Sequence, residues 1–269
     1  MSQTVPFFIS IPHSGEKIPL QAPWLKQLPE NVLMADVDRF VDRLYRPAIE
    51  LLQLPYEVTE WHRYAVDLNR IPDDVDCDSV LGASKPSGTH ADGFHWVMTK
   101  GEQRIMAQPM SRETHDELTQ LIYEPFHAGI RNHYKKFKDL GFQNVFHLDV
   151  HSMPSVGTRM HRDPGEIRAD IVISDCNGGS AHPHFRDLVI AAYVVAGFKV
   201  AYNWPYLGGR VTEQYGKPSI GQQALQVELK RGLYMDEVTK QILPAHIDVQ
   251  KKLSVALAYV KSELPKIIL

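Results

Sequence analysis

His13 and Glu16 directly follow the apolar segment Phe7–Ile11, which is typical of a buried strand. Ligands bind beyond the carboxyl ends of strands in doubly wound sheets, so this turn lies where a site is expected. One short turn can aim the imidazole and the carboxylate at the same ion. Two histidines and a glutamate are an established ligand set for catalytic zinc, which keeps its fourth position for water. By themselves, His13 and Glu16 are more typical of a histidine at a strand end beside a surface glutamate. A zinc site therefore requires a third ligand from elsewhere in the chain.

The apolar segment 145–150 is followed by His151, which is the candidate for that third ligand. Asp149 and His151 are separated by one apolar residue, and therefore lie on the same face of an extended chain. Asp149 can orient a neighbouring group or adjust ligand basicity. His147 shares this face but lies deeper in the strand, and we interpret it as structural. The alternative is a buried, hydrogen-bonded Asp149–His151 pair without a metal.

Arg63 and the pair Asn69-Arg70 form a second polar group. A guanidinium is a planar fork that can donate two parallel hydrogen bonds to a carboxylate, so these residues favour recognition of an acidic ligand. The alternative is a structural salt bridge to Asp67 or Asp73.

Glu228 lies between Val227 and Leu229 in the expected strand 224–229. A buried carboxylate is costly unless it is paired. Glu228 is therefore either salt-bridged, for example to Arg231, or functional. Beside a zinc-bound water, it would be the expected general base.

Apolar β-forming segments alternate with amphipathic helical segments, a pattern typical of a mainly parallel sheet with helices on both faces. The chain shows no repeat and no evident linker, so residues 1–269 are expected to form a single domain. Residues 71–93 are expected to be an irregular loop that covers the site. We expect strands near residues 7–11, 56–61, 64–68, 145–150, 169–174, 200–203 and 224–229, and helices near 36–52, 111–138 with a kink at Pro125, 184–196, and 235–264 with an interruption at Pro244.

The composition argues against several classes of protein. The net charge of −3 provides no basic field, so neither nucleic acid nor an acidic membrane is an expected partner. No apolar run approaches the roughly 18–20 residues of a membrane-spanning helix, and the first residues lack the pattern of a secretory signal. With Cys77 and Cys176 as its cysteines, the chain is not expected to be a disulfide scaffold. We therefore expect a cytoplasmic protein with a small-molecule partner.

Taken in order, these motifs resemble the N-formylglutamate amidohydrolase family. Their layout is also similar to that of the aspartoacylase and zinc carboxypeptidase group. The resemblance implies a three-layer α/β/α fold of the zinc carboxypeptidase type, with a mainly parallel mixed sheet. It extends along nearly the whole chain and rests on residues 11–15, 35–45, 63–70, 149–153, 203–209 and 224–235.

The resemblance also implies one Zn²⁺ ion bound by His13, Glu16 and His151, with Glu228 as the general base. The implied reaction is hydrolysis of N-formyl-L-glutamate to formate and L-glutamate, a step of histidine degradation. A related metallohydrolase that acts on another N-acyl amino acid or on a peptide carboxyl terminus is the first alternative. A non-catalytic carboxylate-binding module on the same fold is the second.

For the substrate, the resemblance implies that Arg63 polarises the scissile carbonyl while Asn69 and Arg70 hold a carboxylate. We add Arg210, which follows Gly208-Gly209, as a candidate for the second carboxylate of a glutamate-like substrate. The segment around Arg210 is either a substrate-binding loop or a plain tight turn. Three further acids match a carboxylate-rich helix of the family or form a solvated helix face: Asp36, Asp38 and Asp42.

Overall fold

The computed structural model describes residues 4–267 and contains one six-stranded sheet. The strand order is β2-β1-β3-β6-β4-β5, and neighbouring strands are parallel except for the antiparallel pair β4 and β6. The predicted mainly parallel mixed sheet is therefore confirmed. The strands are β1 Phe7–Ile11, β2 Tyr56–Val58, β3 Val145–Met153, β4 Ile171–Ser174, β5 Val200–Tyr202 and β6 Gln222–Lys230.

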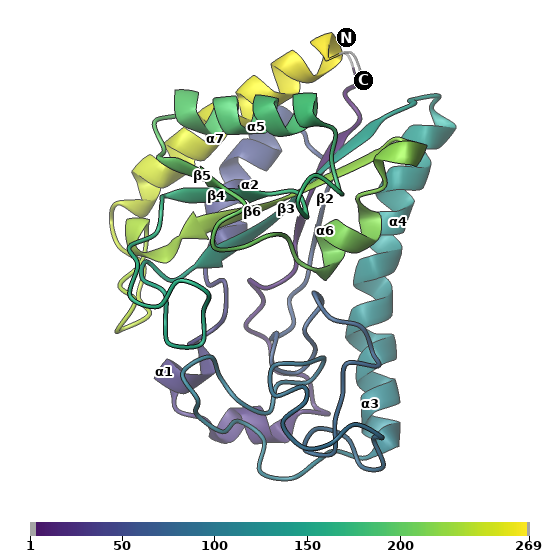
Figure 1. Cartoon of the computed structure of the whole chain (residues 1–269), viewed down its shortest axis with the longest axis vertical. Coiled ribbons are helices and arrows are strands. Elements are labelled where there is room, and N and C mark those ends of the chain that lie inside the picture. The colour runs from purple at the N-terminus through teal and green to yellow at the C-terminus, as the bar shows by residue number, and fades with distance from the viewer. Residues whose placement is uncertain (1–3, 268–269) are drawn as a thin grey trace.

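Helices cover both faces of this sheet (Figure 1). On one face, α2 (Val41–Leu52), α5 (Pro183–Val195) and α7 (His246–Glu263) pack together and onto the strands. On the other face lie α4 (Glu124–Asp139), α6 (Arg210–Tyr215) and the long irregular segment 61–110. The arrangement confirms the predicted three-layer fold. The remaining helical segments are α1 Glu30–Leu33, α3 Arg112–Leu118, a π-helical turn Thr119–Tyr123, and 3₁₀ turns at Pro23–Gln27, Pro218–Ile220, Arg231–Leu233 and Leu264–Lys266. In the described part of the chain, none of the helices combines the length and hydropathy needed to span a bilayer.

The alternation of side chains along the central strands separates the core from the site. Leu148 and Val150 of β3 belong to the apolar core beneath α2, α5 and α7. Asp149 and His151 consequently lie on the opposite face, because successive side chains of a strand point to opposite sides. The parallel register pairs His151 with Glu228 of β6. Polar side chains of two central strands therefore gather on one face of the sheet.

Helix α2 begins later than the sequence pattern predicts. The predicted helix starts at residue 36, whereas α2 starts at Val41, because Phe40 adopts a left-handed backbone with φ of 71°. The residues before it form a loop tied to the end of β1, since the Asp38 amide donates to the His13 carbonyl at 3.0 Å. Asp38 is thereby placed beside His13 instead of on a solvated helix face.

Three other predicted features also differ in the structure. The predicted strand 64–68 is a series of turns, in which the Ala65 amide donates to His62 and the Asp67 amide donates to Phe94. The last helix begins at His246 and not near residue 235, because residues around Pro244 form turns. The expected break at Pro125 is instead a π-helical turn followed directly by α4, which accommodates the missing N–H of proline.

The layer of α3 and α4 contains buried histidines that make stability depend on pH. Burial lowers the pKa of His95 to about 3 and that of His127 to about 4, so both rings are neutral in the folded protein at pH 7. The unfolded chain takes up these protons near pH 6.5. Below that pH the unfolded state binds more protons than the folded state, and the free energy of unfolding falls as the pH falls from about 6.5 towards about 4.

Urea titrations of unfolding across this pH range measure that slope. The variant His95→Gln should show a shallower fall than the wild type. If wild type and His95→Gln have the same slope, His95 does not contribute to the pH dependence of the free energy of unfolding.

Candidate active site

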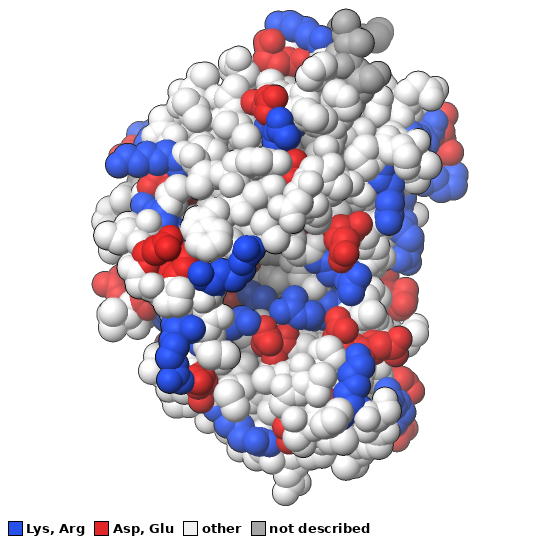
Figure 2. All heavy atoms as spheres, viewed as in Figure 1, with Lys and Arg blue, Asp and Glu red and all other residues white. Residues whose placement is uncertain are grey.

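Residues at the carboxyl ends of β1, β3 and β6 line a cavity of about 260 Å³. Its remaining walls come from the segment 61–110 and from loops that follow β3 and β5. Figure 2 shows a hollow near the middle of one face, with Lys and Arg side chains gathered around its mouth. The residues that line the cavity are His13, Asp36, Asp38, Arg63, Asn69, Arg70, Trp96, Lys100, His151, Ser152, Pro154, His161, Tyr206, Gly208, Gly209, Gln226, Glu228 and Arg231.

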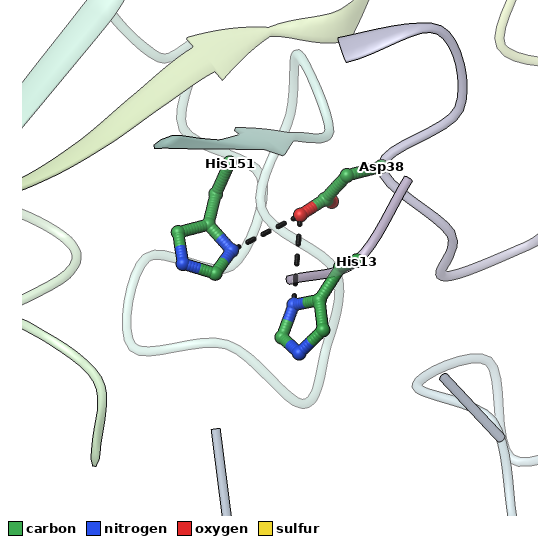
Figure 3. A group of neighbouring side chains, drawn as sticks. All are labelled: His13, Asp38 and His151. Atoms are coloured by element: carbon green, nitrogen blue, oxygen red, sulfur yellow. Dashed lines mark hydrogen bonds and ion pairs between the residues drawn. The ribbon is translucent and has the colours of Figure 1, made fainter. Parts of the chain in front are cut away.

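Three of these residues could hold a metal ion together: His13, Asp38 and His151. One Asp38 carboxylate oxygen lies 3.1 Å from Nδ1 of His151 and 3.6 Å from Nδ1 of His13 (Figure 3). All three side chains are buried, and their ligand atoms lie within 4.8 Å of one another. The histidines come from the ends of two neighbouring strands, as the sequence predicts.

Further carboxylates orient both imidazoles. Asp67 contacts Nε2 of His13 at 2.8 Å, and Asp149 contacts Nε2 of His151 at 2.8 Å. A histidine that binds a metal through one nitrogen usually has the other held by such a partner. Although burial alone would raise it, hydrogen bonds with both histidines hold the pKa of Asp38 well below its usual range. The Nδ1 atoms and an ionised Asp38 thus form a donor set suited to a divalent cation.

The structure does not bring Glu16 into this group. Its carboxylate accepts hydrogen bonds from Nε of Arg39 at 2.9 Å and from Nη2 at 3.3 Å. Asp38 occupies the position next to the histidines that the sequence interpretation gives to Glu16. The acidic pair Asp36 and Asp38 could have signalled this, but the helical pattern of the following residues assigned both to a helix.

Glu228 is buried on the same face as His151 and lines the same cavity. Its carboxylate accepts a hydrogen bond from the Gln226 amide at 2.8 Å. It is not paired with Arg231, whose guanidinium donates instead to Asp38 at 3.0 Å. Burial raises the pKa of Glu228 to about 7. A carboxylate with this pKa can accept a proton and release it again near neutral pH.

The predicted substrate residues Arg63, Asn69 and Arg70 all line the cavity. Arg63 lies over the ring of Trp96, at 4.7 Å from the ring centroid, and donates to Asp67 at 2.9 Å. The salt bridge to Asp67 is therefore present, and it leaves Arg63 in the cavity wall. The Asn69 side-chain amide lies 3.3 Å from Nε2 of His151, and its oxygen accepts from a backbone amide of α6.

Arg210 lies elsewhere. It starts α6, is paired with Glu213 at 3.1 Å, and lines a separate surface hollow with Tyr123 and Lys217. The glycines before it do line the cavity, and Gly209 lies so close to Asn69 that a Cβ would be only 2.4 Å from the side-chain amide. The loop thus contributes backbone to the cavity, whereas the arginine side chain does not.

Several cavity residues were not anticipated from the sequence. Trp96 and Lys100 come from the irregular segment 61–110, and His161 and Tyr206 come from loops that follow β3 and β5. Trp96, Lys100 and His161 lie outside the motifs considered in the sequence, whereas Tyr206 lies in the segment 203–209 on which the resemblance rests. Arg231, which the sequence offered as a salt-bridge partner of Glu228, is paired with Asp38 instead.

The fold and the site define a class: an α/β protein with a buried His–Asp–His group, able to hold a metal ion, inside a cavity rimmed by cations.

The model of the N-formylglutamate amidohydrolase family matches residues 5–235, and the chain belongs to this family. The N-formylglutamate deformylases of Pseudomonas aeruginosa and Pseudomonas putida are 27% and 28% identical to it, and each comparison covers 87% of this chain and 83% of the relative. The crystal structure of N-formylglutamate amidohydrolase from Ralstonia eutropha JMP134 matches with a TM-score of 0.83 at 24% identity, over 99% of this chain and 96% of that one. A gene product of Agrobacterium tumefaciens matches with a TM-score of 0.67 at 19% identity, over 94% and 90% of the two chains. The resemblance drawn from the sequence is confirmed.

Proposed function

We propose that this protein is a metal-dependent amidohydrolase that hydrolyses N-formyl-L-glutamate to formate and L-glutamate. Membership of the family and the names of its two Pseudomonas relatives support the substrate. The observation that carries the chemistry is the buried group His13, Asp38 and His151 at the floor of a cationic cavity.

The proposed ligands are Nδ1 of His13, Nδ1 of His151 and a carboxylate oxygen of Asp38. Two imidazole nitrogens and one carboxylate oxygen suit zinc, and Asp67 and Asp149 hold the two rings from behind. A zinc ion at this position would polarise a substrate carbonyl and acidify a water molecule. Asp38 replaces Glu16 in the ligand set because Arg39 holds the Glu16 carboxylate.

Glu228 is the proposed general base. Its raised pKa and its place beside His151 in the sheet fit a group that takes a proton from the attacking water. As the water oxygen bonds to the formyl carbon and the C–N bond breaks, Glu228 returns the proton to the leaving amine nitrogen. Arg63 faces the same cavity and stabilises negative charge on the carbonyl oxygen.

Asn69 and Arg70 are proposed to hold a carboxylate of the substrate. Arg70 and Lys100 both contact Asp92, so two cations share one carboxylate. The excess positive charge at this wall of the cavity favours an anionic ligand.

A substrate panel tests the proposal. Formate or amine release is measured for N-formyl-L-glutamate, N-acetyl-L-glutamate and N-acetyl-L-aspartate, and for short peptides with a free carboxyl terminus. We expect N-formyl-L-glutamate to have the highest kcat/KM. Preference for an acetylated amino acid or a peptide would support the related metallohydrolase instead, and binding of N-formyl-L-glutamate without turnover of any compound would support a non-catalytic carboxylate-binding module.

A further inference from the structure

A second hollow, of about 390 Å³, adjoins the cavity. Residues common to the walls of both are Asp36, Lys100, Pro154, His161 and Arg231. The two spaces therefore lie on either side of a shared wall that includes Lys100.

Most charged groups around the two spaces already have partners. Arg231 donates to Asp38, to the Ser152 hydroxyl and to backbone carbonyls. Arg63 is paired with Asp67. In the second hollow, the Glu237 carboxylate accepts from the Ser155 amide at 3.0 Å. These groups are fixed parts of the walls.

Lys240 is different. It lines the second hollow and is partly buried, and within residues 4–267 no carboxylate forms an ion pair with its ammonium group. Its backbone is held in place, because its amide donates to Asp236 and its carbonyl accepts from Arg39 at 2.8 Å. Burial, and then the charge of Arg231, lower the pKa of Lys240, although Glu237 and Asp36, which line the same hollow, act in the opposite direction. An anion beside this ammonium would offset the two lowering effects.

We infer that Lys240 forms a second anion subsite, which takes the distal carboxylate of a dicarboxylic substrate. The inference rests on the proposed function and names a residue that selects an acidic side chain. It assigns one carboxylate to the wall of Asn69 and Arg70, and the other to the adjoining hollow. This subsite takes the role that the sequence interpretation gave to Arg210.

Substrates that differ only in the distal group test the subsite. Wild type and Lys240→Met are compared on N-formyl-L-glutamate and on N-formyl-L-glutamine, which is nearly isosteric and neutral at that end. We expect Lys240→Met to raise the KM for N-formyl-L-glutamate about tenfold, with kcat and the KM for N-formyl-L-glutamine unchanged. Lys251→Met, a change at an exposed lysine of α7, serves as the matched control. An equal change for both substrates, or none for either, overturns the subsite.

Binding of substrate-like acids separates this subsite from the reaction. Glutarate should raise the melting temperature of the wild type more than butyrate does, and Lys240→Met should remove the difference. If the wild type releases formate from neither substrate, the proposed function is wrong, and the comparison of glutarate with butyrate still decides the subsite. Equal shifts by the two acids in the wild type contradict it.

Discussion

Replacing Glu228 with Gln is expected to lower kcat for N-formyl-L-glutamate by about 10²–10⁴-fold and to leave the metal content unchanged. Glutamine keeps the shape of the side chain and can still accept the hydrogen bond from Gln226, but it cannot take a proton from water. Steady-state formate release and metal analysis of the same preparation measure both quantities. A variant that binds metal and is inactive would identify Glu228 with the proton-transfer step.

The matched control for this change is Glu213→Gln. Glu213 is exposed, is paired with Arg210 and lies outside the cavity, so its neutralisation should leave kcat as in the wild type. If Glu228→Gln hydrolyses N-formyl-L-glutamate at nearly the wild-type rate, Glu228 is not the general base.

The second large effect concerns the metal ligands. Asp38→Asn should weaken metal binding by at least about 100-fold, because the variant loses the one charged ligand of the proposed set. His13→Ala and His151→Ala should have comparable effects. Glu16→Gln is the matched acid-to-amide change, and it should retain the metal because the Glu16 carboxylate is held by Arg39. Competition with a chromophoric chelator gives the affinities.

Asp38 also binds the buried Arg231, so the folding of Asp38→Asn needs its own measurement. Circular dichroism and the melting temperature, compared with metal-free wild type, separate loss of the ligand from loss of the fold. If Asp38→Asn retains the metal and Glu16→Gln loses it, Glu16 is the ligand and the set expected from the sequence is correct.

The sheet and the positions of the two candidate histidines could be predicted because local patterns determine them. Alternating apolar residues place Asp149 and His151 on one face of β3 wherever that strand sits in the sheet. His13 follows a buried apolar strand, and parallel neighbours bring the ends of β1 and β3 together. For these residues, the periodicity of a strand was sufficient.

Asp38 could not be assigned in the same way, because its position depends on tertiary contacts. The left-handed backbone at Phe40 delays the start of α2, and the hydrogen bond between the Asp38 amide and the His13 carbonyl places the loop at the end of β1. Arg39 then removes Glu16 from the site by pairing with it. None of these contacts produces a periodic pattern in the sequence.

Residues of irregular loops were equally hard to assign. Lys100 lies in a segment without helix or strand periodicity, and its contacts with Asp92 and Trp96 are made within that loop. Arg210 carried a recognisable glycine-rich context, but the start of α6 places its side chain outside the cavity.

Metal dependence of formate release tests the central claim most directly. Purified wild type is assayed with N-formyl-L-glutamate as isolated, after removal of bound metal by a chelator, and after addition of zinc. The account predicts that formate release disappears with the metal and returns when about one zinc ion per chain is bound. Elemental analysis shows whether the treated protein is free of metal. If metal-free protein still releases formate at the undiminished rate, the account is contradicted.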